Sequence, residues 1–138
     1  MTPNYARLCG VYATARALTH GSVEISHYTP ESIANTTIQE LANRVQMLID
    51  ENPDPNALTP VSVTINLKND RSVSTSREFV LGNPKNPLSH PDHLAKLRKN
   101  CASSQPRIPN SQVEALIKRT NNLEREHDVA TLVDLLIA

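Results

Sequence analysis

The residues with the clearest potential for chemistry are one tyrosine and two arginines near the N-terminus. Tyr12 lies in the stretch PNYARLCGVYATARALTHG, with Arg7 and Arg16 about one helical turn away on either side. A phenol and a guanidinium near one another on a helix can bind an anionic substrate, because both donate hydrogen bonds and one is positively charged. Tyr12 can also be a core side chain, and the residues alone favour that interpretation.

The histidines raise the question of a metal site, and only one pair is close in sequence. His90 and His93 stand three residues apart across a predicted helix start. No third ligand has a matching spacing, and Asp92 is better placed to cap the helix than to bind Zn²⁺. We therefore predict surface histidines and no metal site. The remaining histidines are His20, His27 and His127.

A phosphate-binding loop is disfavoured by the glycine content. The chain has three glycines, so Gly82 stands alone in GNPKNPLSHPDHLAKLRKN. Pro84 and Pro87 lack the backbone N–H groups that an anion site uses. We interpret this stretch as a strand-to-helix connection, in which Gly82 ends a hairpin and the two prolines hold an extended chain.

Cysteine chemistry also finds no support in the sequence. Cys9 and Cys101 lie on apolar faces of predicted helices, with no base beside them in sequence. Two cysteines are too few for a disulfide framework, so we expect two reduced, packed thiols.

The composition limits the class of protein. The chain of 138 residues has 14 basic and 14 acidic side chains, so no net field attracts nucleic acid or an anionic membrane. The most apolar windows, 8–18 and 129–138, are too short to span a bilayer. We expect a soluble protein of the cytoplasm, with the mitochondrion as an alternative. Aromatic residues make up 3%, a weak core composition that suggests a covering partner.

Helical periodicity opens the chain. Apolar residues at helical spacing predict one helix over 3–21, ending at Gly21, with Leu8 and Leu18 on its apolar face. A second helix is predicted from Thr29 as N-cap, running into a strand over 45–49 where the apolar residues alternate.

A hairpin is predicted over 61–80. In VSVTINL the apolar residues alternate with Ser, Thr and Asn, and Asn69-Asp70 supplies residues that tolerate positive φ. The apolar side should receive helices, and the Ser/Thr side should be wet or meet a polar partner.

Three helices are predicted to follow the hairpin. Ser89 with Asp92 forms a capping box for the first, Ser111 with Glu114 for the second, and Asp128 caps the last. The sequence therefore predicts an α+β fold, with a small, at least partly antiparallel sheet of about three strands packed with helices, and helices at both termini.

The order of these segments resembles the C-terminal part of the MmgE/PrpD family, which includes 2-methylcitrate dehydratase, cis-aconitate decarboxylase and iminodisuccinate epimerase. Four stretches carry the resemblance: ARLCGVYATARALTHGSV, IQELANRVQM, the hairpin leading to GNPKNPLSHPDHLAKLRKNCA, and VEALIKRTNNLEREHDVATLVDLL. The third, a glycine followed by Pro-Leu-Ser and a helix with Lys96, is the most specific. Cys9 and Gly10 depart from the serine and the bulky residue that the family usually has.

The resemblance implies a single lid domain over 1–138, with 111–138 as helices that return to a helical domain. Family members carry most of their acid–base residues in that helical domain, so the chain is expected to be inactive alone. Tyr12 matches the family's lid tyrosine, which implies a catalytic role facing a small polycarboxylate. The implied chemistry is a cofactor-free dehydration or decarboxylation.

Two alternatives remain open at this point. The implied partner is a separate helical-domain polypeptide or a second copy of the chain, with neither nucleic acid nor membrane involved. A non-catalytic binding or assembly module that keeps the family fold is the alternative function.

Overall fold

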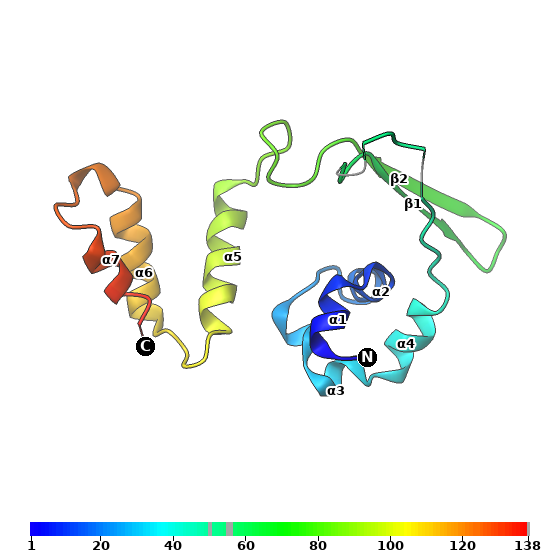
Figure 1. Cartoon of the computed structure of the whole chain (residues 1–138), viewed down its shortest axis with the longest axis horizontal. Coiled ribbons are helices and arrows are strands. Elements are labelled where there is room, and N and C mark those ends of the chain that lie inside the picture. Colours follow the sequence, from blue (N-terminus) through cyan, green and yellow to red (C-terminus); the bar gives the residue numbers. More distant parts are fainter. Residues whose placement is uncertain (50, 55–56, 138) are drawn as a thin grey trace. The chain divides into compact units, whose positions relative to one another are not determined.

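The computed structural model describes residues 1–49, 51–54 and 57–137. Helices form both terminal regions, and the described residues contain one antiparallel sheet of two strands (Figure 1). The predicted α+β class is confirmed, with two strands where about three were expected. The chain packs as two compact units: a terminal unit, Met1–Ile49 with Leu97–Ala138, and a hairpin unit, Asp50–Lys96. The single domain over 1–138 stays a prediction.

The N-terminal segment forms two helices and not the single helix predicted over 3–21. Helix α1 spans Pro3–Leu8 and helix α2 spans Gly10–His20. Between them Cys9 is extended, with φ −90° and ψ 100°, and its N–H bonds to Ala6. The residue after the break is glycine, which costs a helix about 1 kcal/mol relative to alanine. Helix α2 ends as predicted at Gly21, whose φ is +72°.

The second predicted helix is also divided. A short 3-10 helix, η1 (Ile25–Tyr28), leads into α3 (Pro30–Ile33), for which Thr29 is the N-cap as predicted. Asn35 then caps a separate helix, α4 (Thr36–Ala42), by accepting the N–H of Ile38 at 3.1 Å. An asparagine in an N-cap conformation satisfies one of the free donors of a helix start, so it favours a new helix here.

No strand forms over 45–49, and the prediction of one there is wrong. The N–H of Val45 bonds to the carbonyl of Ala42, which prolongs the end of α4 as turns. Ile49 is 99% exposed. Met47 reaches Gly10 instead, where an added Cβ would lie 3.1 Å from its terminal methyl.

The core of the N-terminal helices is built from small and branched side chains. The predicted apolar face is wrong in part: Ala15 is buried as the helical spacing predicts, but Leu8 is 89% exposed and Leu18 is 48% exposed. The break at Cys9 gives α1 and α2 separate directions, so their faces do not continue one another. The buried cluster consists of Ala6, Tyr12, Ala15, Ile33 and Ile38.

The hairpin is confirmed. Strands β1 (Val61–Asn66) and β2 (Ser72–Arg77) pair antiparallel, with Val63 opposite Thr75. The turn contains Asp70 at φ +60°, in agreement with the expected positive φ. The apolar side of the hairpin is not buried, contrary to prediction, because Val63 is 40% exposed and Val73 is 55% exposed.

The connection after the hairpin is a closed turn and not the extended chain predicted around its prolines. The N–H of Gly82, at φ +97°, bonds to Asn86, and the side chain of Asn86 bonds to the carbonyl of Phe79. Half of the predicted capping box of Ser89 and Asp92 is present: Ser89 Oγ accepts the N–H of Asp92 at 3.2 Å, but the Asp92 carboxylate accepts from the Ser89 hydroxyl and not from its backbone N–H. Helix α5 (His90–Ala102) follows.

The last segment contains α6 (Asn110–Thr120), the 3-10 helix η2 (Leu123–Arg125) and α7 (Ala130–Asp134). The predicted Ser111–Glu114 capping box is wrong, because α6 begins after Pro109 without a side-chain cap. The N-cap of α7 is Val129 and not Asp128 as predicted, although the carboxylate of Asp128 accepts the N–H of Ala130 at 2.9 Å. Within α6 the predicted apolar residues Val113, Leu116 and Ile117 are buried.

Candidate functional site

Tyr12 occupies the centre of the N-terminal core and its hydroxyl has two partners. The side chain is 1% exposed, and its ring lies 5.9 Å from the ring of Tyr28. The hydroxyl donates to the carbonyl of His27 at 2.6 Å and accepts from Nε of Arg16 at 3.0 Å. The phenol is therefore fixed in direction, with its donor role and one acceptor role both in use.

Arg16 is the most unusual member of this cluster, because its charge is buried without a carboxylate. The residue is 4% exposed, and its guanidinium carbon lies 5.3 Å from the ring centre of Tyr12. One terminal nitrogen, Nη2, donates to the carbonyl of Ser32. In the part of the chain that the structure describes, neither an Asp nor a Glu pairs with it.

The remaining nitrogen of Arg16, Nη1, keeps a path to solvent. This nitrogen makes no hydrogen bond to a described residue, and it is not fully buried. A buried cation normally has a paired anion, because removing its hydration costs several kcal/mol. The arrangement thus holds a positive charge with the N–H groups of Nη1 open to a further partner among the described residues.

His27 connects the cluster to the segment that precedes η1. Its Nδ1 accepts the N–H of Glu24 at 3.1 Å, and its ring lies 4.8 Å from that of His20. Burial lowers the pKa of His27, and the charges of Arg16 and His20 lower it further. His27 is therefore held neutral with its proton on Nε2.

Glu24, the acid whose charge acts on His27, is already engaged. Glu24 pairs with Lys99 at 2.7 Å, and the hydrogen bond from Lys99 is the main cause that lowers the pKa of Glu24. The Tyr12 cluster, defined as Tyr12, Arg16, His20 and His27, is consequently positive and rich in donors. Such a cluster suits an anion, and the one lone pair of neutral His27, on Nδ1, is occupied.

The comparison with protein families decides the class of protein. The profile of the MmgE/PrpD C-terminal domain matches residues 1–124. The chain belongs to the MmgE/PrpD family. The matched range contains the Tyr12 cluster, the hairpin, α5 and α6, and it ends within η2. A search of curated protein sequences gives no significant match.

Arg7 does not join the Tyr12 cluster of this MmgE/PrpD domain, although the sequence places it near Tyr12. It lies on α1 beyond the break at Cys9, is exposed, and donates to the side chain of Asn4 at 3.4 Å. Of the two predicted arginines, only Arg16 approaches the phenol, because it lies four residues after Tyr12 on the same helix.

Sequence reasoning missed His27 and Ser32 as partners of Tyr12 and Arg16. Both contribute backbone carbonyls, which leave no trace in residue type. The available signal was the run from Thr29 to Glu31, which predicted a helix start close behind α2. The sequence does not show how η1 and α3 pack against α2, and this packing decides which backbone carbonyls face Tyr12 and Arg16.

The structure gives the surroundings of each remaining candidate of the MmgE/PrpD domain. His90 and His93 are exposed on α5, Cys9 is half-buried and Cys101 is buried, both as free thiols. The described ranges contain no group of three His, Cys, Asp or Glu able to hold a metal ion. Among the helices of the described residues, none is long and apolar enough to cross a membrane.

Proposed function

We propose that this chain is the lid domain of a cofactor-free lyase of the 2-methylcitrate dehydratase or cis-aconitate decarboxylase type, acting on small polycarboxylates. The observation that carries the proposal is the buried charge of Arg16, which contacts Tyr12 and lacks a carboxylate within the described residues. Membership of the MmgE/PrpD family supplies the reaction class.

A substrate carboxylate would be the missing counter-ion of Arg16. Hydrogen bonds between a guanidinium and a carboxylate are about twice as strong as neutral ones, and the strength grows where water is excluded. Nη1 is the donor that remains for this contact. The charges of Arg16 and His20, which lower the pKa of His27, would attract an anion to the same place.

Tyr12 would act from within this cluster. Its hydroxyl now donates to the carbonyl of His27, and Arg16 donates to its oxygen. We propose that, when substrate binds, the segment around His27 shifts and the phenol donates to the substrate. Tyr12 would then be a proton donor or a carboxylate ligand, and Arg16 would hold it in place.

The cluster leaves the removal of a proton to another part of the enzyme. Neutral His27 uses Nδ1 to accept from Glu24, so it has no lone pair available as a base. Members of the MmgE/PrpD family carry most of their acid–base residues in a helical domain, so the proposed reaction takes its base from that domain, on a separate polypeptide or elsewhere on a longer one. We expect no turnover by the 138 residues alone.

The test is reconstitution with a helical domain of an MmgE/PrpD enzyme from the same genome. With that domain added, the parent chain should process cis-aconitate or 2-methylcitrate, and Arg16→Met should raise KM at least about tenfold, as expected when a charged hydrogen bond is lost. The matched control is Arg7→Met, which changes an exposed arginine outside the cluster. Equal KM values for both variants would contradict the assignment of Arg16.

A non-catalytic binding or assembly module is the second candidate, and one observation favours it. The hydroxyl of Tyr12 is buried and has both partners within the chain, as in a structural tyrosine. In the reconstituted system Tyr12→Phe separates the two functions. A rate unchanged by this substitution would favour the module, whereas a loss of kcat would favour the lid.

A further inference from the structure

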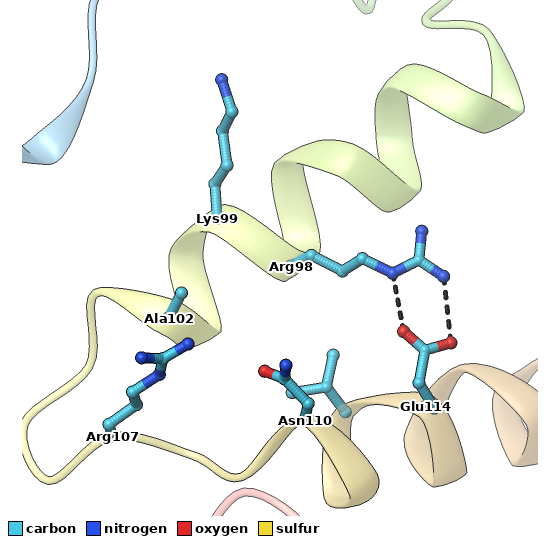
Figure 2. Close-up of a pocket in the computed structure, with 7 residues that line it drawn as sticks. Arg98, Lys99, Ala102, Arg107, Asn110 and Glu114 are labelled. Atoms are coloured by element: carbon cyan, nitrogen blue, oxygen red, sulfur yellow. Dashed lines mark hydrogen bonds and ion pairs between the residues drawn. The ribbon is translucent and has the colours of Figure 1, made fainter.

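The terminal unit has a second place where a charge lacks its counter-ion. An open cavity of about 440 Å³ lies between α5 and α6 (Figure 2). Its walls include Arg98 and Ala102 from α5, Arg107 from the connection, and Asn110, Val113 and Glu114 from α6. None of these residues belongs to the Tyr12 cluster, so the site would be additional to the proposed function.

The one acidic side chain in this cavity is fully engaged. Glu114 accepts from Nε and Nη2 of Arg98 at 2.7 and 3.0 Å, the parallel pair of bonds drawn in Figure 2. The hydrogen bond from Arg98 holds the pKa of Glu114 below its ordinary value, so the carboxylate is ionised at neutral pH. The two charges cancel and form a neutral side of the cavity.

Lys99 lines the cavity, but its charge is paired elsewhere. Its Nζ pairs with Glu24 at 2.7 Å, and in Figure 2 the side chain extends away from Arg98 and Glu114. The ammonium group is therefore already compensated outside the cavity.

Arg107 supplies the charge that remains. It has neither a hydrogen bond nor an ion pair with any described residue. Figure 2 shows its guanidinium rising from the connection beside Ala102, on the same side as the amide of Asn110. That amide has no hydrogen bond within the described chain either. A guanidinium and an amide, both free to donate, form a natural contact for one carboxylate.

Apolar groups lie next to these donors. Val113 is 3% exposed and, with the methyl group of Ala102, lines the cavity. We propose that this cavity binds a small aliphatic monocarboxylate, whose carboxylate contacts Arg107 and Asn110 and whose tail lies against the exposed methyl group of Ala102. A single charge matches Arg107, the one cation among the described lining residues that has no ion-pair partner.

Butyrate is a suitable probe, with butyramide as its uncharged analogue and inorganic phosphate as an anion without a tail. Each is titrated into the full chain while backbone amide signals are followed by NMR. Butyrate should give saturable shifts at Asn110 and Val113, and butyramide and phosphate should bind at least about tenfold more weakly. Equal binding of butyrate and butyramide, or of butyrate and phosphate, would overturn the proposal.

Two substitutions locate the site within the chain. Arg107→Gln should weaken butyrate binding roughly tenfold, whereas Arg125→Gln, at another exposed arginine, should leave it unchanged. Glu114→Gln should strengthen binding severalfold, because it frees the charge of Arg98. These side chains are exposed, so the fold is retained, which circular dichroism checks. Butyrate affinity that is the same in Arg107→Gln and the parent would refute the site.

Discussion

Arg16 donates from Nε to the hydroxyl oxygen of Tyr12 over 3.0 Å, and both side chains come from α2. Since Arg16 uses the oxygen as an acceptor, the phenol proton is directed to the carbonyl of His27 at 2.6 Å. The other end of the guanidinium bonds to the carbonyl of Ser32. Two adjacent side chains of one helix thereby tie α2 to both η1 and the end of α3.

The first prediction concerns the stability that the Tyr12 hydroxyl provides. Tyr12→Phe removes the acceptor of Arg16 and the donor to His27, leaving two polar groups unpaired in a buried place. We expect the free energy of unfolding to fall by about 1–3 kcal/mol, the usual cost of an unsatisfied buried group. Urea titration followed by circular dichroism measures this change.

The control for this variant is Tyr5→Phe, at a tyrosine that is 65% exposed. It should change the free energy of unfolding by less than about 0.5 kcal/mol. Similar values for the two variants would show that the buried hydroxyl is not a stabilising group.

The second prediction concerns Arg16, whose replacement should change the free energy of unfolding less than that of Tyr12. Arg16→Met removes two hydrogen bonds but also removes a desolvated charge without a carboxylate partner in the described residues. Replacing buried charges by apolar side chains of similar size is often neutral or stabilising. We expect the free energy of unfolding to stay within about 1 kcal/mol of the parent value.

The same urea titration separates function from structure at this position. If Arg16 is kept to bind a substrate carboxylate, the variant is stable and the reconstituted enzyme is impaired. A destabilisation larger than that of Tyr12→Phe would mean that Arg16 serves the fold.

The third prediction is a pH dependence of stability that comes from His27. Burial first, then the charges of Arg16 and His20, hold its pKa in the folded chain below the ordinary value of 6.5. The unfolded chain therefore binds the proton more readily, and stability rises with pH in this range. The contribution of neutral His27 to the free energy of unfolding is complete above pH 6.5. It is lost as the pH falls from 6.5 through the pKa of His27 in the folded chain.

Urea titrations at pH 7.5 and pH 5.5 test this dependence. His27→Gln should reduce the loss of stability between the two values, whereas His93→Gln, at an exposed histidine on α5, should leave it as in the parent. A parent chain that is more stable at pH 5.5 than at pH 7.5 would contradict the role given to His27.

The fourth prediction concerns the uncovered side of the hairpin. Val63 and Val73 are 40% and 55% exposed on one side of a sheet whose described strands are β1 and β2, and isolated hairpins are marginal in water. We expect the parent chain to bind the dye ANS and to self-associate. The double variant Val63→Thr, Val73→Thr should lose much of the fluorescence.

The polar side of the same strands provides the comparison. Ser62→Ala, on the side opposite to Val63, should leave the dye signal unchanged or slightly raise it. A parent chain that is monomeric and gives no ANS signal would remove the argument for a covering partner.

Local signals were sufficient for part of the fold. The caps at Thr29 and Ser89, the positive φ of Asp70 and the left-handed Gly21 are all properties of a residue and its immediate neighbours. The apolar face of α6 was also predictable, because Leu116 and its neighbours repeat at helical spacing. These features depend little on the rest of the molecule.

Other features depended on packing that the sequence does not show. Gly10 and Asn35 stand where the two predicted helices break, yet whether a helix breaks at such residues depends on its surroundings. The absent strand over 45–49 follows from where α4 ends and from Met47 packing on Gly10.

The candidate site illustrates the same limit. Tyr12 and Arg16 were found through residue type and spacing on a predicted helix, and the resemblance to the lid tyrosine of the family added the catalytic role of Tyr12. Their burial together was not predictable from residue type, because arginine is rarely buried without a partner. The carbonyl partners at His27 and Ser32 required the structure.

The reconstituted enzyme provides the most direct measurement of the central claim. The chain is assayed for turnover of cis-aconitate and of 2-methylcitrate, first alone and then with a helical domain of an MmgE/PrpD enzyme from the same genome. We predict no turnover by either component alone, turnover by the mixture, and a loss of at least about tenfold in kcat with Tyr12→Phe. Turnover by the chain alone, or a mixture whose kcat is unaffected by Tyr12→Phe, would contradict the account.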